Sequence, residues 1–225
     1  MKIGFIGAGS VGQTLAEALI GKGHDVVIGV RDPGADALTK DRGHAGTLGA
    51  WVDRTGGRVG SFADAANHGE IVFNVTAGHA SLAALTAAGP GNLSGKVLVD
   101  VANPLDLSHG MPPFLMADYT GPTSLAEQIQ TAFPEARVVK AFNTIAASVM
   151  VNPALIPGAH DLFIAGNDAA AKAVVSSLAT GFGWQHIVDL GDIVGARATE
   201  ALLPIWLRLW GVTGAFTHNL HLAKA

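Results

Sequence analysis

The feature that most constrains the fold is a glycine-rich turn, Gly7-Ala8-Gly9-Ser10-Val11-Gly12, close to the start of the chain. It lies between an apolar run that predicts a β-strand, Lys2–Ile6, and a segment with helical spacing, Val11–Lys22. In that setting the first glycine permits a tight turn, the second lets the backbone approach a pyrophosphate, and the third lets the helix pack against the strand. The alternative is a turn that needs glycine for its geometry alone. The pattern predicts a dinucleotide site with contacts from Gly7, Gly9, Ser10, Val11 and Gly12.

Short apolar runs alternate with helical patterns along the chain, which is typical of stacked βαβ units around a parallel sheet. We therefore expect an α/β fold with a doubly wound, mostly parallel Rossmann-type sheet. Residues 1–142 are predicted to form the dinucleotide-binding domain. Residues 143–225 are predicted to form a small C-terminal α/β extension that packs on it and ends in a long apolar helix. The predicted strands are Lys2–Ile6, Asp25–Gly29, Ile71–Val75, Val97–Val101, Val138–Phe142, Asp161–Ala165 and Gln185–Val188, with a weaker one at Arg58–Gly60. The predicted helices are Val11–Lys22, Ser81–Ala88, Ser124–Phe133 and Ala169–Thr180.

Three segments depart from this alternation. Asp41–Gly57 is glycine-rich and is expected to loop over the surface, whereas Asp106–Pro122 is too long for an ordinary connection and shows no periodic pattern. The last segment, Ala196–Ala225, opens as a helix with apolar residues nearly all round it, which predicts burial on more than one side. A core helix, a dimer interface and a wall of a substrate pocket are compatible interpretations. A homodimer through this apolar helix is one expectation.

Composition argues against several functional classes. The 225 residues are 49% hydrophobic and 14% charged, with a formal net charge of −4 and no cysteine. A general nucleic-acid binder would show a basic face, and thiol chemistry or zinc–thiolate binding needs cysteine. No apolar stretch approaches the ~20 residues that span a bilayer, and no cluster of His, Asp and Glu has the spacing of a metal site. We expect a cytoplasmic protein with no nucleic-acid partner, no membrane partner and no metal.

The end of the second predicted strand bears on which dinucleotide binds. An acidic residue there would hold the ribose 2′-hydroxyl of NAD, whereas an arginine would pair with the 2′-phosphate of NADP. Both types are present, in Arg31-Asp32-Pro33. Asp32 precedes Pro33, and this pair favours the start of a helix. The carboxylate oxygens of Asp32 would then accept hydrogen bonds from backbone N–H groups of that helix. The alternative for Arg31 is a solvated surface charge. Because Arg31 has no comparable local role, we favour NADP over NAD.

Four segments together resemble the deazaflavin-dependent NADP reductase family. They are the glycine turn, the run from Gly23 to Arg31, the segment Phe142-Asn143-Thr144-Ile145, and Asp189-Leu190-Gly191-Asp192 with the apolar helix after it. This resemblance spans essentially the whole chain and implies hydride transfer between NADPH and a deazaflavin- or flavin-like acceptor. The family's 2′-phosphate pocket often carries further basic or hydroxyl residues around the arginine. Here Val30 and Asp32 flank Arg31, so a thinner pocket is expected.

The resemblance also implies that the loops after successive strands surround the nicotinamide half of the cofactor. Ligands of open parallel sheets bind outside the carboxyl ends of the strands, which points to the same loops. Carried over to this chain, the contacts are Thr76 and Ala77, Asn103 and Pro104, and Ala141 and Asn143. A plain turn is the alternative for Asn103-Pro104, and a helix N-cap is the alternative for Asn143.

No catalytic residue is predicted. Hydride transfer between two stacked rings depends on positioning and asks little of acid–base groups. Lys140 lies near the end of an apolar strand, and a side chain that emerges there is a simpler interpretation than a catalytic one. Two other functions remain open: a dehydrogenase or imine reductase for a small organic substrate, and a non-catalytic NADP-sensing protein. The first would need a larger helical C-terminal domain than the chain provides.

Overall fold

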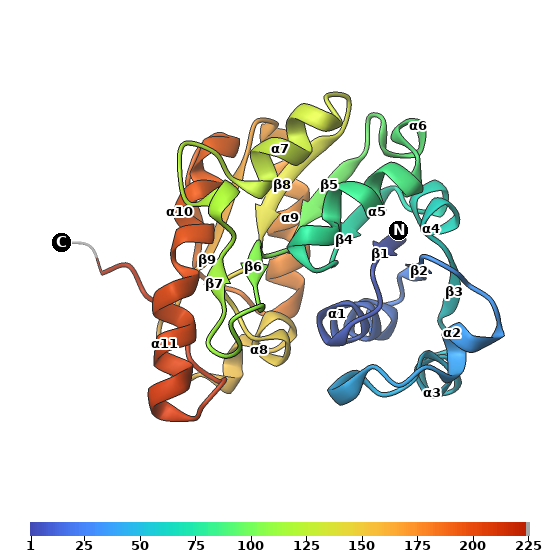
Figure 1. Ribbon diagram of the computed structural model, residues 1–225, viewed down its shortest axis with the longest axis horizontal. Helices are drawn as coiled ribbons and strands as arrows, with labels where there is room; N and C mark the ends of the chain where they lie inside the picture. The colour runs from blue at the N-terminus through green and yellow to red at the C-terminus, as the bar shows by residue number, and fades with distance from the viewer. Residues whose placement is uncertain (224–225) are drawn as a thin grey trace.

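The computed structural model describes residues 1–223 and is organised around one sheet, shown in Figure 1. Within these residues the sheet has eight strands in the order β10-β9-β8-β5-β4-β1-β2-β3. Six of them run parallel in the order typical of dinucleotide-binding folds, β9 is antiparallel to β8, and β10 is parallel to β9. The strands are β1 (Lys2–Ile6), β2 (Asp25–Val30), β3 (Arg58–Ser61), β4 (Ile71–Asn74), β5 (Val97–Asp100), β8 (Arg137–Ala141), β9 (Leu162–Gly166) and β10 (Ile187–Asp189). The predicted α/β class and mostly parallel sheet are confirmed.

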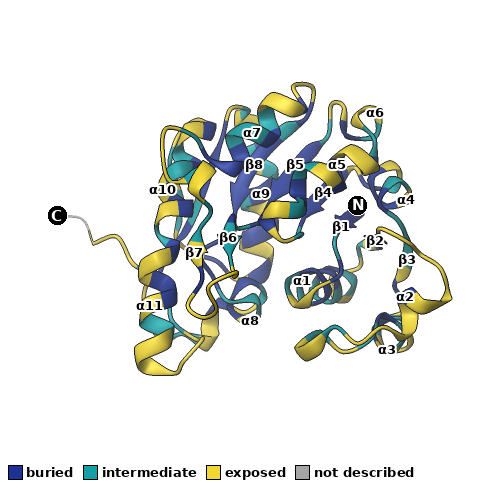
Figure 2. Ribbon diagram, viewed as in Figure 1, coloured by how far each residue is buried: buried dark blue, intermediate teal, exposed yellow. Residues whose placement is uncertain are grey.

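Helices cover both faces of the sheet. Along β1, Ile3 and Phe5 face one apolar cluster and Ile6 faces the other, as strand alternation requires. One face is covered by α1 (Ser10–Gly21), α3 (Leu48–Thr55), α8 (Ala147–Val151) and α9 (Ala169–Phe182). The opposite face is covered by α4 (Phe62–His68), α5 (Ser81–Ala88), α6 (Pro90–Leu93), α7 (Leu125–Ala132) and α10 (Ala196–Ala201). The central strands in Figure 2 are accordingly buried, and exposure is concentrated on the outer sides of the helices.

The expectation of a surface loop over Asp41–Gly57 is wrong in its second half. After a short 3₁₀ turn, η1 (Gly43–Ala45), the chain forms α3, and Trp51 of that helix is fully buried. The Thr47 hydroxyl accepts the Ala50 N–H at the start of α3, and Gly56 ends it in a left-handed conformation. These capping signals are present in the sequence, but the many glycines obscured them.

A helix that the sequence did not predict, α4, packs closely on the sheet. A capping box of Ser61 and Asp64 opens it. A side chain at Gly4 of β1 would collide with the Ala65 carbonyl, so the absence of one lets α4 lie directly on the strand. The helix is short, and its alanines gave too little periodicity to distinguish it from a loop.

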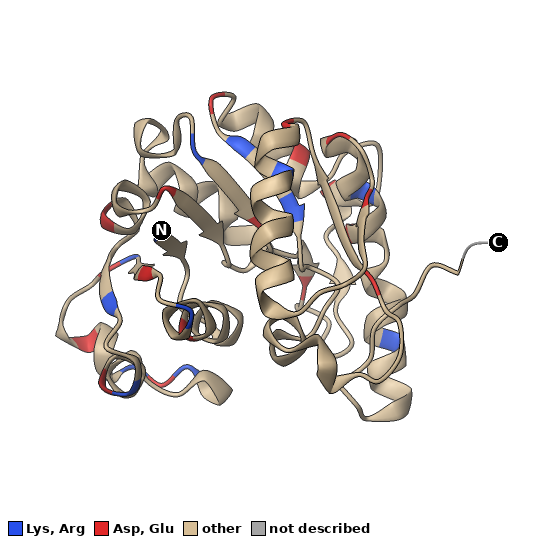
Figure 3. Cartoon of the chain, turned by 180° about the vertical axis from the view of Figure 1, so that it is seen from behind, with Lys and Arg blue, Asp and Glu red and all other residues tan. Residues whose placement is uncertain are grey.

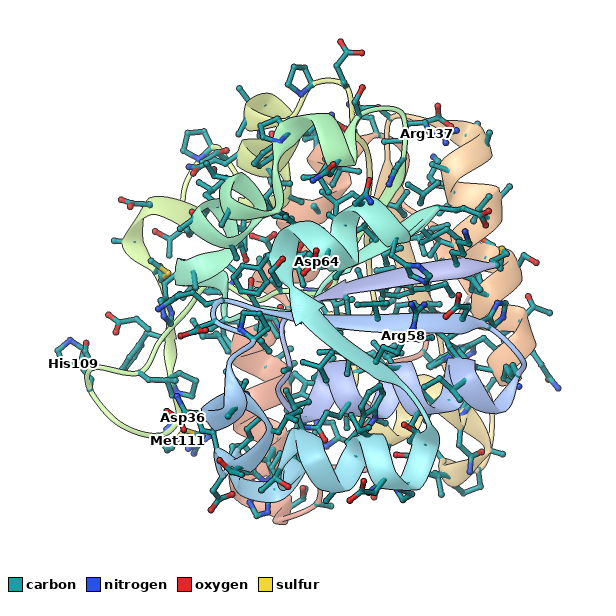
Figure 4. The ribbon with its side chains drawn as sticks, turned by 90° about the vertical axis from the view of Figure 1, so that its right-hand side faces the viewer. Asp36, Arg58, Asp64, His109, Met111 and Arg137 are labelled. Carbon is teal, nitrogen blue, oxygen red and sulfur yellow. The ribbon has the colours of Figure 1, made fainter. Side chains whose placement is uncertain are left out.

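The long segment from Asp106 to Pro122 is mostly irregular but not unstructured. It contains a two-stranded antiparallel pair, β6 (Leu105–Asp106) with β7 (Phe114–Leu115), and a 3₁₀ turn, η3 (Ala117–Tyr119). His109 and Met111 lie on the connection between β6 and β7, which projects from the body of the molecule in Figure 4.

The C-terminal apolar segment forms two helices, α10 and α11 (Leu203–Thr213), which adjoin at Leu202. Within the chain α11 buries one face, with Leu203, Trp206 and Leu207. Ile205 and Val212 are 51% and 64% exposed. The expectation of burial on more than one side is therefore wrong for this chain by itself. The last two residues of the predicted segment lie outside the described residues. No helix in residues 1–223 is long and apolar enough to cross a membrane.

Candidate functional site

The glycine turn lies where the strand order reverses, between β1 and β4. Gly7 has a φ of 118°, and a side chain there would lie 2.9 Å from the Val75 carbonyl oxygen. A Cβ at Gly12 would lie 2.9 Å from the Gly7 carbonyl oxygen and 3.0 Å from Val75 Cγ2. The first and third glycines therefore allow a tight turn and close packing of α1 on the sheet, as the sequence predicts.

The middle glycine has the opposite environment. A Cβ at Gly9 would meet nothing within 4 Å, so the space in front of it is open. Gly9 is also the N-cap of α1, and no side chain caps that helix end. Backbone N–H groups of the first helical turn, in Ser10, Val11 and Gly12, thus face this open space without a side-chain cap. The arrangement fits an anionic pyrophosphate.

On one side of the turn lies a hollow of about 590 Å³ that we call the basic hollow. It is lined by Val30, Arg31, Asp32, Gly34, Ala35, Asp36, Ala37, Lys40, Arg42 and Phe62. Arg31 is exposed, and no ion pair or side-chain hydrogen bond holds it within the described part of the chain. Lys40 and Arg42 join it from the segment that follows α2 (Ala35–Thr39). The prediction of a thinner pocket rests on the residues adjacent to Arg31; the hollow adds these two basic side chains and also the carboxylates of Asp32 and Asp36.

Asp32 stabilises the turn that shapes the basic hollow. Its Oδ1 accepts the Gly34 N–H at 3.1 Å, so a backbone group of the following segment occupies it, as predicted. The predicted helix start is misplaced, however, because α2 begins at Ala35 and Gly34 is its N-cap. Asp32 thus forms a local turn ahead of the helix instead of capping it. The Arg42 guanidinium donates to the Ala37 carbonyl at 3.1 Å and ties the two ends of this segment together.

On the other side of the turn lies a cavity of about 500 Å³ that we call the apolar cavity. It is lined by Ser10, Val11, Thr14, His44, Asn103, Leu105, Asn143, Ile145, Ala146, Ala147, Ser148, Leu203, Trp206, Leu207 and Phe216. Residues at the start of α1 and residues of α8 and α11, three helices labelled in Figure 1, contribute to its lining. Apolar surface predominates, with a few polar groups from strand ends. A flat, largely apolar ring fits such a cavity.

Two asparagines join the strand-end loops beside this cavity. Asn103 donates from its amide to the Asn143 carbonyl at 2.8 Å, and the Asn143 amide donates to Asn103 Oδ1 at 3.1 Å. Asn143 also donates to the Thr199 carbonyl of α10 at 3.2 Å. It is therefore not a helix N-cap, which rejects the alternative interpretation of Asn143. Phe142, just before it, has a left-handed backbone with a φ of 64°, which costs about 1 kcal/mol or more and turns the chain at the end of β8.

Beneath the loops lies a buried ion cluster of Lys140, Asp100 and Glu200. Lys140 Nζ is 2.9 Å from Asp100 Oδ2 and 2.9 Å from Glu200 Oε1, and all three side chains are almost fully buried. Burial opposes the charge on Lys140, but the two carboxylates outweigh burial and raise the pKa of its ammonium group. The expectation that this side chain emerges at the strand end is wrong. Because Lys140 is paired inside the protein and lines neither hollow, its geometry gives no support to a catalytic role.

The cluster connects two parts of the site to the C-terminal extension. Lys140 also donates to the Ala102 carbonyl at 2.6 Å, directly before Asn103. Glu200 accepts the Leu125 N–H at 2.9 Å at the start of α7. Asp100, the other carboxylate of the cluster, accepts a hydrogen bond from the Asn74 amide at 2.8 Å. The Thr76 hydroxyl in turn donates to Asn74 Oδ1 at 2.8 Å. Thr76, predicted as a cofactor contact, is thus held by hydrogen bonds that lead to the cluster.

The structure brings together most of the predicted site residues. Ser10, Val11, Asn103 and Asn143 line the apolar cavity, Arg31 lines the basic hollow, and Gly7, Gly9 and Gly12 form the turn between the two. Thr76 and Ala77 follow β4 at the same edge of the sheet. Pro104 and Ala141 are buried and line neither hollow, and Ala141 is 0% exposed within β8. The sequence did not single out Lys40, Arg42 or His44, whereas the aromatic residues after Pro204 belong to the segment for which a pocket wall is one of the sequence interpretations.

The histidines and charged residues of the described range do not form a metal site. His79, which follows Thr76, is exposed. Across the described range 1–223, no three His, Asp or Glu side chains are grouped so that they could hold a metal ion. Charged residues are thinly spread between the elements in the view of Figure 3 and do not gather into one basic face there.

Comparison with known proteins yields consistent similarities. The model of the family described as coenzyme F420-dependent NADP oxidoreductase matches residues 2–104. A solved structure of a candidate F420-dependent NADP reductase from Arthrobacter sp. FB24 is 50% identical, covers 100% of both chains and has a TM-score of 0.93. The metalloreductase STEAP3 of Rattus norvegicus is 31% identical over 91% of this chain, which spans only 38% of that protein. The F420-dependent NADP reductase of Methanocaldococcus jannaschii is 31% identical over 52% of each chain.

Proposed function

The chain belongs to the family of coenzyme F420-dependent NADP oxidoreductases, and we propose that it transfers a hydride between NADPH and a deazaflavin- or flavin-like ring. The observation that carries this proposal is the apolar cavity beside the glycine turn. The cavity offers apolar and aromatic surface on the side away from α1, where a second flat ring can lie against the nicotinamide. A small carbonyl or imine substrate would leave much of that surface without contacts.

NADP is proposed to lie across the turn with its adenosine half at the basic hollow. Arg31 faces the 2′-phosphate, with Lys40 and Arg42 in the same hollow. A guanidinium can bind a phosphate through two parallel hydrogen bonds, which an uncharged ribose hydroxyl does not offer. Gly9, Ser10 and Val11 approach the pyrophosphate. Asn103, Asn143 and the loop with Thr76 and Ala77 position the nicotinamide.

The protein contributes positioning to the reaction. NADPH supplies a hydride, the acceptor ring takes its two electrons and one hydrogen, and a proton from solvent completes the reduced ring. No group of this chain has to give or take a proton in the transfer itself. The hydrogen-bonded asparagines and the buried ion cluster beneath them hold the loops rigid, so that two rings can meet at contact distance.

An acceptor panel tests the proposal. Oxidation of NADPH is followed at its near-ultraviolet absorbance with 8-hydroxy-5-deazariboflavin, FMN, FAD, a ferric chelate, a ketone and a cyclic imine. We expect a deazaflavin or flavin to be reduced much faster than the ketone or the imine. Reduction of the imine or ketone alone would overturn the proposal. Tight NADPH binding without turnover on any acceptor would favour a sensing protein instead.

Three further proposals concern the domains, the location and the oligomeric state of the protein. We propose that residues 1–142 act as the nucleotide-binding domain and 143–225 as an extension packed on it, and that the protein works in the cytoplasm. We also propose a homodimer through α11, because its outward face carries the exposed apolar side chains of Ile205 and Val212. Light scattering after gel filtration tests the dimer, and Val212→Glu should shift the mass towards that of one chain. A single-chain mass for the unmodified protein would overturn it.

A further inference from the structure

We propose that a C-terminal strap, residues 214–222, holds Phe216 as one wall of the apolar cavity and so determines which hydride acceptors bind. The proposal rests on the proposed function, because it concerns the ring that would accept the hydride. The sequence indicates a pocket wall only as one interpretation of the whole segment Ala196–Ala225 and singles out no residue of the strap. The strap is fixed to the protein at both of its ends.

The strap begins where α11 ends. Gly214 has a left-handed φ of 68° and turns the chain back along the helix, as Figure 1 shows in red. His218 then lies beside α11, with Nε2 3.2 Å from the Trp206 carbonyl and Nδ1 2.9 Å from the Ala215 carbonyl. The imidazole ring also packs on the Trp206 indole, with ring centres 4.6 Å apart. The first half of the strap is therefore held against the helix that lines the cavity.

These contacts place Phe216 in an aromatic group with the two tryptophans of α11. Its ring centre lies 4.3 Å from that of Trp210 and 6.2 Å from that of Trp206. Phe216 nevertheless remains 51% exposed, and part of its surface lines the apolar cavity together with Trp206. A phenyl ring that is packed on one side and free on the other is suited to contact a flat ligand.

The second end of the strap is anchored at the start of β9. Asp161 is 2% exposed, and its carboxylate accepts the Leu222 N–H, while its own N–H donates to the Leu220 carbonyl at 2.9 Å. The Asn219 amide donates to the Asp161 carbonyl at 3.0 Å. These bonds to one buried residue involve backbone groups as well as side chains. They give the strap a defined path across the surface.

In the described part of the chain, the strap makes no hydrogen bond with the groups proposed to bind NADP, although Phe216 lines the same cavity as Asn103 and Asn143. No residue of the strap lines the basic hollow or contacts the glycine turn in a hydrogen bond within the described residues. Because the phosphates of NADP are proposed to bind at the glycine turn and the basic hollow, loss of the Phe216 ring should weaken binding of the acceptor much more than binding of NADPH. Damage to the fold as a whole would weaken both.

The test compares Phe216→Ala with Phe114→Ala, which removes a phenyl ring of similar exposure, 61%, that lines neither hollow. Affinity for FMN and for 8-hydroxy-5-deazariboflavin is measured by the fluorescence anisotropy of the ring, in the presence of saturating NADP⁺. We expect a three- to tenfold weaker acceptor affinity for Phe216→Ala, about the loss of one aromatic contact. NADPH affinity from calorimetry should stay within about twofold in both variants. Phe216→Trp should retain acceptor binding.

The anchor is tested by Asn219→Ala, which leaves the buried Asp161 in place and so avoids a folding defect. It should weaken acceptor binding in the same direction and speed chymotrypsin cleavage within the strap, as mapped by mass spectrometry. Unchanged acceptor affinity in Phe216→Ala, or equal losses for acceptor and NADPH, would overturn the proposal. Because binding is measured without turnover, a protein that binds the ring but never reduces it contradicts the proposed function and leaves the strap supported. A protein that binds neither ring overturns both.

Discussion

The two hollows beside the glycine turn are built in opposite ways. The basic hollow takes Arg31, Lys40 and Arg42 from one short stretch of chain, and its charged groups are largely exposed. The apolar cavity takes residues from the turn, from several strand ends and from the C-terminal segment, and its loops rest on a buried ion cluster.

This difference separates recognition from positioning. An exposed arginine can bind a phosphate without supporting the fold, so its loss should affect binding only. A buried lysine between two carboxylates supports the fold first, and its loss should affect stability first. The same contrast predicts which variants change affinity and which change the free energy of unfolding.

The largest effect is expected for Lys140→Met. Removing the ammonium group leaves two carboxylates, of Asp100 and Glu200, buried without their cation, which should cost about 3–5 kcal/mol of unfolding free energy. Urea denaturation followed by tryptophan fluorescence measures it. Because the pKa of Lys140 is raised, the stabilisation should persist at neutral pH and be lost as the pH rises through that raised value.

Lys172→Met provides the matched control, since Lys172 pairs with a half-exposed carboxylate, Asp189, at 2.8 Å. It should cost less than about 1 kcal/mol. Equal losses for the two lysines would remove the distinction between a supporting ion cluster and an ordinary surface pair.

The next effect concerns the basic hollow. Arg31→Ala should weaken NADPH binding about tenfold to a hundredfold, because a charge-assisted hydrogen bond contributes about 1.5–3 kcal/mol. NADH binding and the unfolding free energy should hardly change. The control is Arg58→Ala on β3, labelled in Figure 4, whose guanidinium pairs with Asp25 and lines neither hollow. Equal weakening of NADPH and NADH would mean that Arg31 does not contact the 2′-phosphate.

Two glycines of the glycine turn allow a sharper comparison. Gly12→Ala forces a methyl group against the Gly7 carbonyl and Val75, and should cost about 1–3 kcal/mol of stability. Gly9→Ala places the methyl group in open space, so the unfolding free energy should stay within about 0.5 kcal/mol while NADPH binding weakens. Thermal unfolding and calorimetric titration distinguish the two. If Gly9→Ala binds NADPH normally, the pyrophosphate does not approach this glycine.

The smallest effect is expected at the rim of the molecule. Arg197 of α10 pairs with Glu127 of α7, outside the buried pair of Lys140 and Glu200. Burial works to raise the pKa of Glu127, but hydrogen bonds from Arg197 and Ser124 outweigh it and lower that pKa. Glu127→Gln should cost about 1 kcal/mol or less at neutral pH. The difference from the unmodified protein should shrink as the pH falls through the lowered pKa, which urea denaturation at several pH values measures.

Sequence reasoning succeeded where the information is local. The strands, the glycine turn and the exposed Arg31 each follow from a few adjacent residues. Arg42 was missed because its segment, Asp41–Gly57, reads as a glycine-rich loop, although the capping signals around α3 are present in it.

The parts that were missed depend on contacts between distant segments. Nothing near Lys140 in the sequence indicates that Asp100 and Glu200 will meet it, and an apolar strand made an emerging side chain the simpler expectation. A pocket wall is one interpretation of the whole segment Ala196–Ala225, but nothing in the sequence singles out Phe216, because its position depends on Gly214 and on the anchor at Asp161.

The pairing of Lys140 with Glu200 also limits how this fold can be recombined. A chimera that joins residues 1–142 of this chain to the C-terminal segment of a relative inherits Lys140 and depends on the donor for its second carboxylate. If the donor segment has no acid at that place, the α7 N–H groups and the lysine lose their shared partner inside the protein. A chimera should therefore keep Lys140 and Glu200 together, although they lie on different sides of the proposed domain boundary.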